Sequence, residues 1–283
     1  MQKTVFLNGE FLPEDEAKVS IFDRGFLFAD GVYEGIPVIG GKLMDVAPFL
    51  ERFDRSLKAL DMAWPMSQEA YLEMIDTLIA KNSLTEGGIY TQVTRGAAPR
   101  VFEFPKGLTP TCMAFTFEKQ ILEHPDATHG VKVVTTEDIR WKRRDIKSLM
   151  LLGQCIAKEQ AVKQGADEGW MVEDGYVTEG TASSAYIVKD GVVITRPLSH
   201  EILPGIRRKL LLEIAPKYGI MVEQRPFTVA EAYEADEAFL SSATTIIYPI
   251  IEIDGRKIGE GRPGKVAQKL RRLYLEEAMK LIS

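Results

Sequence analysis

Short strand patterns and longer helical patterns follow one another along this chain without strict alternation, and this order limits the possible folds. Asn8-Gly9 lies between two short apolar runs, which is typical of a β-hairpin. Apolar residues at helical spacing follow over 49–60 and again over 68–82, where Ser67 is the predicted N-cap. Because the chain lacks a regular strand–helix–strand repeat, we expect an α+β fold.

The chain has 283 residues, a length that suits two domains. Residues 120–130 lose periodicity and carry Pro125, Asp126 and Gly130, so we interpret them as an interdomain linker. The sequence thus predicts a smaller N-terminal domain at 1–119 and a larger C-terminal domain at 131–283. In the larger domain, we expect a strand over 131–136, a helix over 149–164, several short strands, and a last helix over 264–282.

Composition and charge exclude several classes of function. The net charge of −6 does not favour nucleic acid or an anionic membrane, and no apolar run is long enough to span a bilayer. The histidines are scattered without metal-ligand spacing, so we expect no metal site. Cys112 and Cys155 lie far apart, which fits two free thiols in a reducing compartment and predicts a cytoplasmic protein.

Lys147 stands in Asp145-Ile146-Lys147-Ser148-Leu149, between a strand pattern and a helical pattern. Apolar neighbours reduce the hydration of a lysine amine, which favours the neutral, nucleophilic form that a Schiff base requires. The alternative is an ordinary lysine at a strand end with its amine in water. This segment alone does not decide between the two interpretations.

Three later segments could contact a cofactor. Glu179 ends a strand pattern and precedes Gly180 and four small residues, a run that exposes backbone amides to a ligand. Its carboxylate could hold a heteroaromatic nitrogen in the protonated form, or belong to a polar turn. The sequence Ile-Leu-Pro-Gly-Ile at 202–206 precedes a predicted helix whose free amides could bind phosphate. Residues 241–245 place hydroxyl groups between two strands.

In this order, the segments resemble those of fold-type-IV pyridoxal-phosphate enzymes. Within that superfamily, the stretches 23–25, 30–34, 94–100 and 145–149 are most similar to those of D-amino-acid aminotransferases. The resemblance runs from Phe6 to Gly255. It implies pyridoxal 5′-phosphate as the cofactor, a small α/β domain, a large domain with a mixed, barrel-like sheet, and a homodimer.

The resemblance also implies a role for each matching residue. Lys147 would bind the cofactor as a Schiff base and move the proton from the substrate Cα, and Glu179 would pair with the pyridine nitrogen. Arg52 would hold the phosphate, although its neighbours are typical of a solvent-exposed helix face. Arg100 would bind the substrate α-carboxylate. The other implied contacts are Leu203, Ile206, Arg207, Ser242, Ala243 and Thr244 for the cofactor, and Tyr33 and Phe102 for the substrate.

Three positions depart from the family pattern. Phe102 stands where a histidine is usual, so the carboxylate site is less polar and we expect side activity toward (R)-amines. Arg207 stands where threonine follows the Ile-Leu-x-Gly-Ile sequence, and could either replace the lost phosphate contact or point to solvent. Ala243 stands in place of a phosphate-binding threonine.

The sequence therefore predicts transamination between a D-amino acid, of the D-alanine or D-glutamate type, and a 2-oxo acid. Two alternatives use the same fold. One is a branched-chain L-amino-acid aminotransferase, against which Arg100 argues. The other is an aminodeoxychorismate lyase, which would use the same lysine to eliminate pyruvate. The presence of both Lys147 and Glu179 argues against a non-enzymatic cofactor carrier.

Overall fold

The computed structural model describes residues 2–280, which divide into two compact units. Unit 1 comprises the chain up to Ile121 together with Ile146–Met150. Unit 2 comprises Leu122–Asp145 and the chain from Leu151 onward. The segment that carries Lys147 thus packs with the N-terminal part of the chain, although it lies far along the sequence.

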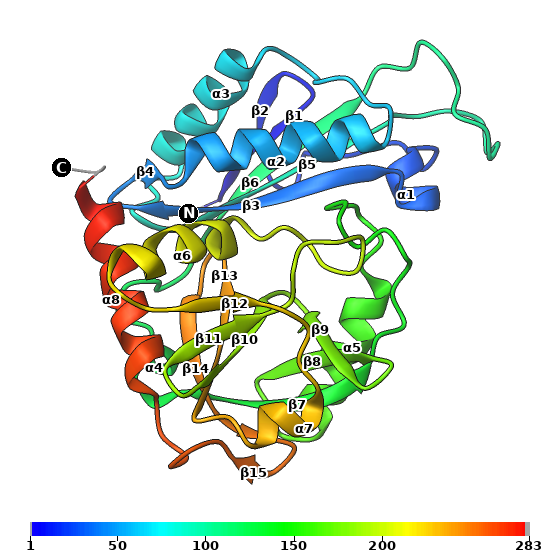
Figure 1. The fold of residues 1–283 in the computed structure, drawn as a ribbon. Coiled ribbons are helices and arrows are strands. Elements are labelled where there is room, and N and C mark those ends of the chain that lie inside the picture. Colours follow the sequence, from blue (N-terminus) through cyan, green and yellow to red (C-terminus); the bar gives the residue numbers. More distant parts are fainter. Residues whose placement is uncertain (1, 281–283) are drawn as a thin grey trace. The chain divides into compact units, whose positions relative to one another are not determined.

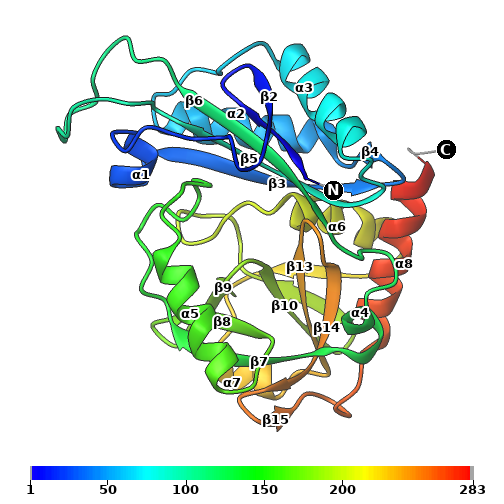
Figure 2. The same ribbon diagram turned by 180° about the vertical axis from the view of Figure 1, so that it is seen from behind.

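Unit 1 contains a six-stranded antiparallel sheet with the strand order β2-β1-β6-β5-β3-β4. Helices α2 and α3 cover one face of this sheet (Figures 1 and 2). The strands are β1 (Thr4–Leu7), β2 (Glu10–Pro13), β3 (Gly31–Ile39), β4 (Lys42–Leu43), β5 (Glu86–Thr94) and β6 (Thr111–Glu118), and the helices are α1 (Arg24–Phe28), α2 (Val46–Ala59) and α3 (Gln68–Lys81).

Local sequence explains the hairpin and the start of α3. Asn8 and Gly9 have φ values of 50° and 101°, as a two-residue turn of the predicted hairpin requires. The hydroxyl of Ser67 accepts the Ala70 N–H at 3.2 Å, which confirms the predicted N-cap. Helix α2 begins at Val46, three residues before the predicted start.

Unit 2 contains a mixed nine-stranded sheet with the order β12-β11-β10-β13-β14-β7-β8-β9, and β15 pairs with β14. The sheet curls in Figure 1, and helix α8 packs along β13 and β14. The strands are β7 (Val131–Glu137), β8 (Glu168–Glu173), β9 (Tyr176–Gly180), β10 (Ser184–Lys189), β11 (Val192–Thr195), β12 (Val222–Gln224), β13 (Glu237–Ser242), β14 (Ile246–Ile253) and β15 (Arg256–Lys257). The helices are α4 (Pro125–His129), α5 (Leu152–Lys163), α6 (Ile206–Lys217), α7 (Val229–Tyr233) and α8 (Lys265–Lys280).

The core of unit 2 is built from side chains of elements that are distant in sequence. Trp170 of β8 and Phe227 are buried with their ring centroids 5.8 Å apart. Leu240 and Ile250 belong to the same cluster of buried side chains. Burial of such large apolar groups is the main favourable term in folding.

Three further predicted details of secondary structure differ from the structure. The aperiodic segment 120–130 contains the five-residue helix α4, which starts at Pro125 and is capped by the His124 side chain. Helix α5 begins at Leu152 rather than at 149, because the preceding residues pair with β3 instead. The predicted helix over 264–282 starts at Lys265, and its last two residues lie outside the described part of the chain. The domain limits and the linker remain predictions.

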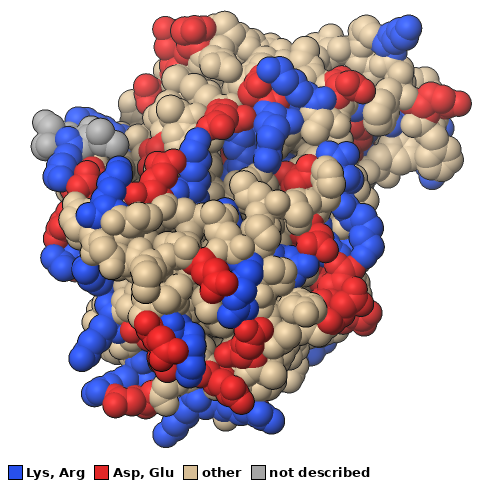
Figure 3. All heavy atoms as spheres, viewed as in Figure 1, with Lys and Arg blue, Asp and Glu red and all other residues tan. Residues whose placement is uncertain are grey.

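Charged side chains of both signs are interspersed on the surface shown in Figure 3. This mixture agrees with a modest net charge of −6. Within residues 2–280, no helix is both long enough and apolar enough to cross a lipid bilayer.

Gly31 leaves room for the segment that carries Lys147, and its replacement should destabilise unit 1. A Cβ on Gly31 would lie 2.6 Å from the Val93 carbonyl oxygen and 2.8 Å from Cδ1 of Leu149. We expect Gly31→Ala to lower the free energy of unfolding by about 1–3 kcal/mol, the usual cost of overpacking. Gly35 lies in the same strand, and a Cβ there meets no atom within 4 Å. Urea denaturation should show Gly35→Ala as neutral or slightly stabilising, and equal stability of the two variants would contradict this account.

Candidate active site

Lys147 is held against strand β3 by backbone pairing. The Tyr33 N–H donates to the Lys147 carbonyl at 3.0 Å, and the Leu149 N–H donates to the Gly31 carbonyl at 3.1 Å. Val32 and Ser148 form an antiparallel bridge between these two bonds. Lys147 therefore lies in a short extended stretch that pairs with β3.

The Lys147 amine contacts an aromatic ring. Its Nζ lies 4.2 Å from the centroid of the Tyr33 ring, and the residue is half-buried. Tyr33 stacks on Tyr90, which stacks on Phe115, so an aromatic row crosses β3, β5 and β6. Contact with a ring face holds the amine by cation–π attraction when it is protonated and limits its hydration. The Tyr33 ring thus shields one side of the Lys147 amine from water.

Arg52 is buried in unit 1 and forms a bidentate ion pair with Glu34. Its Nε and Nη2 donate to Oε1 and Oε2 of Glu34 at 2.8 and 2.6 Å. Arg52 is 8% exposed and Glu34 is fully buried. The expectation of a solvent-exposed helix face is therefore wrong at Arg52, because this face of α2 packs on β3. The paired carboxylate fixes the direction of the guanidinium group.

Arg100 and Phe102 lie in the loop between β5 and β6, which projects from the sheet at the end where α1 lies (Figures 1 and 2). The guanidinium carbon of Arg100 lies 5.4 Å from the Phe28 ring centroid and 5.5 Å from that of Phe102. Both residues are exposed, Phe102 at 77%. Phe102 thus flanks the guanidinium with an apolar ring and supplies no hydrogen-bond donor.

Glu179 in unit 2 is buried at the end of β9 and held from two sides. The Leu203 N–H lies 3.2 and 3.1 Å from its two carboxylate oxygens, and Nη1 of Arg140 donates to Oε1. Burial raises the pKa of Glu179 above its ordinary value, while the charge and hydrogen bond of Arg140 act in the opposite direction. These hydrogen bonds therefore fix the position of the Glu179 carboxylate, and Arg140 favours its ionised form.

Sequence reasoning missed Arg140, whose surroundings in the chain suggest only a strand-like pattern and a basic cluster. Its Nε and Nη2 donate to Oδ1 and Oδ2 of Asp138 at 2.9 and 2.7 Å. The Thr178 hydroxyl donates to the same Asp138 at 2.6 Å. Burial works to raise the pKa of Asp138, but the hydrogen bond and charge of Arg140 outweigh burial, so this pKa is lowered. The Asp-x-Arg spacing was the available signal, although it did not indicate Glu179 as a partner.

The predicted phosphate region of unit 2 begins where α6 begins. Gly205 is the N-cap and makes no side-chain cap bond, so Ile206 opens a twelve-residue helix. Arg207 is 3% exposed and donates from Nη2 to the Ala243 carbonyl at 2.9 Å and from Nε to the Ser242 carbonyl at 3.5 Å. Its guanidinium carbon also lies 4.0 Å from the Tyr274 ring centroid. Of the two expectations for Arg207, pointing to solvent is wrong.

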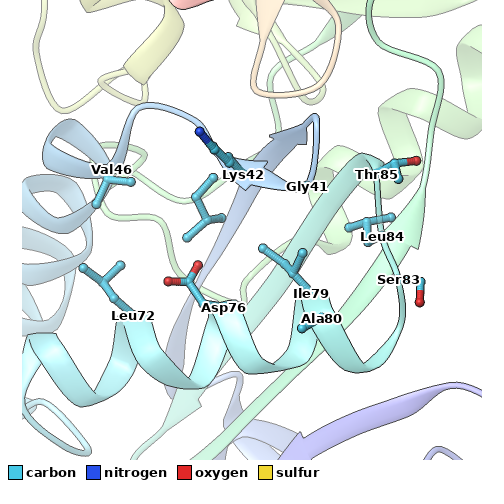
Figure 4. A pocket seen from close by; sticks show the side chains of 11 residues that line it. Gly41, Lys42, Val46, Leu72, Asp76, Ile79, Ala80, Ser83, Leu84 and Thr85 are labelled. Carbon is cyan, nitrogen blue, oxygen red and sulfur yellow. The ribbon is translucent and has the colours of Figure 1, made fainter. Parts of the chain in front are cut away.

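A pocket elsewhere on unit 1 contains none of the predicted site residues. It has a volume of about 640 Å³ and lies between β4, α2 and α3, as Figure 4 shows. Its walls are mainly apolar, with the Asp76 carboxylate at one side. The pocket therefore adds nothing to the chemistry of Lys147 or Glu179.

In the described residues, no group of three or more His, Cys, Asp or Glu side chains could hold a metal ion.

Comparison with known proteins identifies the family. The class IV amino-transferase family matches residues 31–253. D-alanine aminotransferases of Staphylococcus epidermidis and Bacillus licheniformis are 43% and 37% identical, over 94% of this chain and 94% of theirs. A branched-chain amino acid aminotransferase of T.th., solved with pyridoxamine 5′-phosphate, has a TM-score of 0.90 at 28% identity and covers 98% of this chain and 94% of its own. The Escherichia coli branched-chain enzyme has a TM-score of 0.92 at 24% identity, covering 98% and 95%.

The chain belongs to the class IV aminotransferases, and it has the fold-type-IV architecture of pyridoxal-phosphate enzymes. Its cofactor is pyridoxal 5′-phosphate. The residues present fit this group. A buried, oriented carboxylate suits a protonated pyridine nitrogen, a helix N-terminus without a side-chain cap suits a phosphate, and a lysine amine suits the aldehyde.

Arg140 should make a large contribution to stability, because two buried carboxylates depend on it. We expect Arg140→Met to lower the free energy of unfolding by about 3–5 kcal/mol at neutral pH. Without the guanidinium, the folded-state pKa values of Asp138 and Glu179 rise. A carboxyl whose pKa is higher in the folded state than in the unfolded state lowers the stability at pH values above the unfolded-state pKa. The stability lost in Arg140→Met should therefore become smaller as the pH falls and Asp138 and Glu179 bind protons.

Urea denaturation at pH 7.5 and pH 5.5 measures this effect. Arg143→Met is the matched control, because Arg143 pairs with Asp145 at the surface and should contribute no more than about 0.5–1 kcal/mol. A pH-independent deficit in Arg140→Met would contradict the proposed dependence of the two carboxyls.

Proposed function

We propose that this aminotransferase transfers the amino group of a D-amino acid, of the D-alanine or D-glutamate type, to a 2-oxo acid. The observation that carries the proposal is the 43% identity to a D-alanine aminotransferase over 94% of both chains. The exposed guanidinium of Arg100 adds a group that suits a substrate α-carboxylate.

The proposed roles follow from where each group is held. Bound pyridoxal phosphate supplies an electron sink for the bond that breaks at the substrate Cα. Lys147 attaches the cofactor and then moves the proton at Cα, a task that suits an amine fixed beside Tyr33. Glu179 keeps the pyridine nitrogen protonated, and Arg140 keeps Glu179 ionised and oriented. Leu203, whose N–H contacts Glu179, would pack against the cofactor ring.

The phosphate contacts come from both the helix N-terminus and side chains in this proposal. The Ile206 amide at the start of α6 and the Arg52 guanidinium bind phosphate oxygens. Ser242, Ala243 and Thr244 contribute from the turn after β13. Arg207 acts on the same turn through the Ser242 and Ala243 carbonyls.

Lys147→Ala should abolish covalent attachment of the cofactor and essentially all transamination. The variant lacks the only group at this position that could be fixed to the cofactor by borohydride. Peptide mass spectrometry after borohydride reduction should locate the adduct on Lys147 in the wild type. Lys142→Ala is the control, since Lys142 is exposed and pairs with Glu173. An adduct of equal yield in Lys147→Ala would refute the assignment.

Arg100→Ala should impair D-alanine far more than an amine that has no carboxylate. A charge-assisted contact contributes about 1.5–3 kcal/mol, so kcat/KM for D-alanine should fall roughly ten- to hundred-fold. The value for (R)-1-phenylethylamine should change little. Phe102→His adds a donor and should raise the preference for D-alanine. Equal losses for both substrates would remove the carboxylate role from Arg100.

One experiment separates this function from its alternatives on the same fold. Single-turnover cofactor spectra should change with D-alanine and D-glutamate, and weakly with (R)-1-phenylethylamine. A response to L-leucine instead would support the branched-chain alternative, which the 28% identical solved structure keeps open. Aminodeoxychorismate should yield pyruvate only if the chain is the lyase.

We also propose that the enzyme is a homodimer. Large apolar side chains are exposed on the stretch before and within α1 and on the β5–β6 loop, and such a patch favours a protein interface. They are Val19, Ile21, Phe22, Phe26, Val101, Phe102 and Phe104. Sedimentation should give a dimer for the wild type and a weaker one for Phe26→Glu, and a wild-type monomer would end this proposal.

A cytoplasmic location completes the proposal. It is supported by the cysteine content, since Cys112 and Cys155 are unpaired in the described chain and so few cysteines are typical of reducing compartments. Fractionation of cells that express the native chain tests it directly.

A further inference from the structure

A buried cluster of three charged side chains lies beside the loop that carries Arg100. Oδ2 of Asp30 accepts from Nε of Arg24 at 2.7 Å and from Nε of Arg95 at 2.8 Å. All three residues are buried, with Arg24 at 2% exposure. Since buried charges are stable only when paired, the shared carboxylate fixes both guanidinium groups.

The two arginines use their remaining donors on different backbone segments. Arg95 donates from Nη2 to the Leu60 carbonyl at 2.7 Å, at the end of α2. Arg24 donates from Nη1 to the Val101 carbonyl at 2.6 Å. Val101 stands between Arg100 and Phe102, so Arg24 holds the backbone of the loop at the residue between the two proposed substrate contacts.

Aromatic rings tie the same loop to the cluster a second time. The Phe104 ring centroid lies 3.8 Å from the Arg95 guanidinium carbon and 5.7 Å from that of Arg24. The Phe28 ring lies 4.7 Å from the guanidinium carbon of Arg24 and 5.4 Å from that of Arg100. The loop is therefore anchored on both sides of Phe102, although its own side chains are mostly exposed.

We propose that Arg24, fixed by Asp30, is a positioning residue that holds the loop 99–104 in the conformation in which Arg100 binds the substrate carboxylate. The inference rests on the proposed function and adds a residue that sets substrate selection without touching the substrate. A planar guanidinium reaches Asp30 and the Val101 carbonyl at once, whereas a lysine has one compact ammonium and cannot hold both. Preorganising Arg100 removes the ordering cost that a mobile loop would add to each binding event.

Arg24→Lys in the cofactor-loaded enzyme tests the proposal, because it keeps the charge and removes the fork. We expect KM for D-alanine to rise about tenfold, the effect of losing one charge-assisted hydrogen bond, while kcat changes less than about threefold. The kcat/KM for (R)-1-phenylethylamine should stay unchanged, since it needs no carboxylate contact. Hydrogen exchange of the Val101 amide, which donates to the Pro99 carbonyl at 2.8 Å, should become at least about tenfold faster.

Two further variants separate positioning from general stability. Leu78→Ala removes a fully buried side chain of α3 and lowers stability without contacting the loop, so KM and loop exchange should remain at wild-type values. Phe104→Leu keeps the Arg24–Asp30–Arg95 cluster and removes only the ring contact. It should shift KM for D-alanine in the same direction by about threefold, because a cation–π contact contributes less than a charge-assisted hydrogen bond. If Arg24→Lys does not fold, Phe104→Leu tests the proposal in its place.

Faster loop exchange with an unchanged KM for D-alanine would overturn the proposal, as would an equal loss for D-alanine and the carboxylate-free amine. Failure of the proposed function looks different. In that case the wild type turns over L-leucine and not D-alanine, and the same KM comparison is made with L-leucine, which also has an α-carboxylate. An unchanged exchange rate in Arg24→Lys would show that Arg24 does not anchor the loop.

Discussion

The pairing of residues 147–149 with strand β3 is the constraint on which the rest of the site depends. Two backbone hydrogen bonds and the Val32–Ser148 bridge hold this stretch through the backbone alone. Gly31 permits the close approach, because a Cβ there would overlap Val93 and Leu149. The direction of the Lys147 side chain toward Tyr33 follows from this backbone position. A catalytic amine placed by a strand pairing is held more precisely than one on a mobile loop.

Arginine–carboxylate contacts then orient the other charged groups within each unit. Glu34 fixes Arg52, Asp30 fixes Arg24 and Arg95, and Asp138 fixes Arg140, which in turn contacts Glu179. Replacing such buried pairs by apolar residues often leaves stability unchanged or improves it, so stability alone does not explain them. Their common effect is to fix the direction of a charged side chain. Each one aims a planar charged group whose function requires a defined geometry.

Sequence patterns predicted the parts of this fold that depend on neighbours in the chain. The predicted turn at Asn8-Gly9 has positive φ values at both residues, as a two-residue turn between short strands should. Helices α1 and α4 were missed because five residues are too few to show a 3.6-residue period. Lys147 and Glu179 were named from motifs. Arg140 and Arg24 were not named as site residues, because their partners lie 39 and 77 residues away and no periodicity links them.

Arg207 stands where the family pattern has threonine, and its role follows from its contacts and not from its residue type. A cation at the start of α6 suggested either a phosphate ligand or a solvent-exposed side chain. In the structure, Arg207 is buried against Tyr274 and donates to carbonyls of the turn after β13. Arg271 donates to the Thr245 carbonyl of the same turn at 2.8 Å. Two guanidinium groups thus hold the carbonyls of one short turn. An arginine at this position therefore fixes the backbone of the turn through its carbonyls. A threonine has only one short hydroxyl, so the two residue types are not equivalent here.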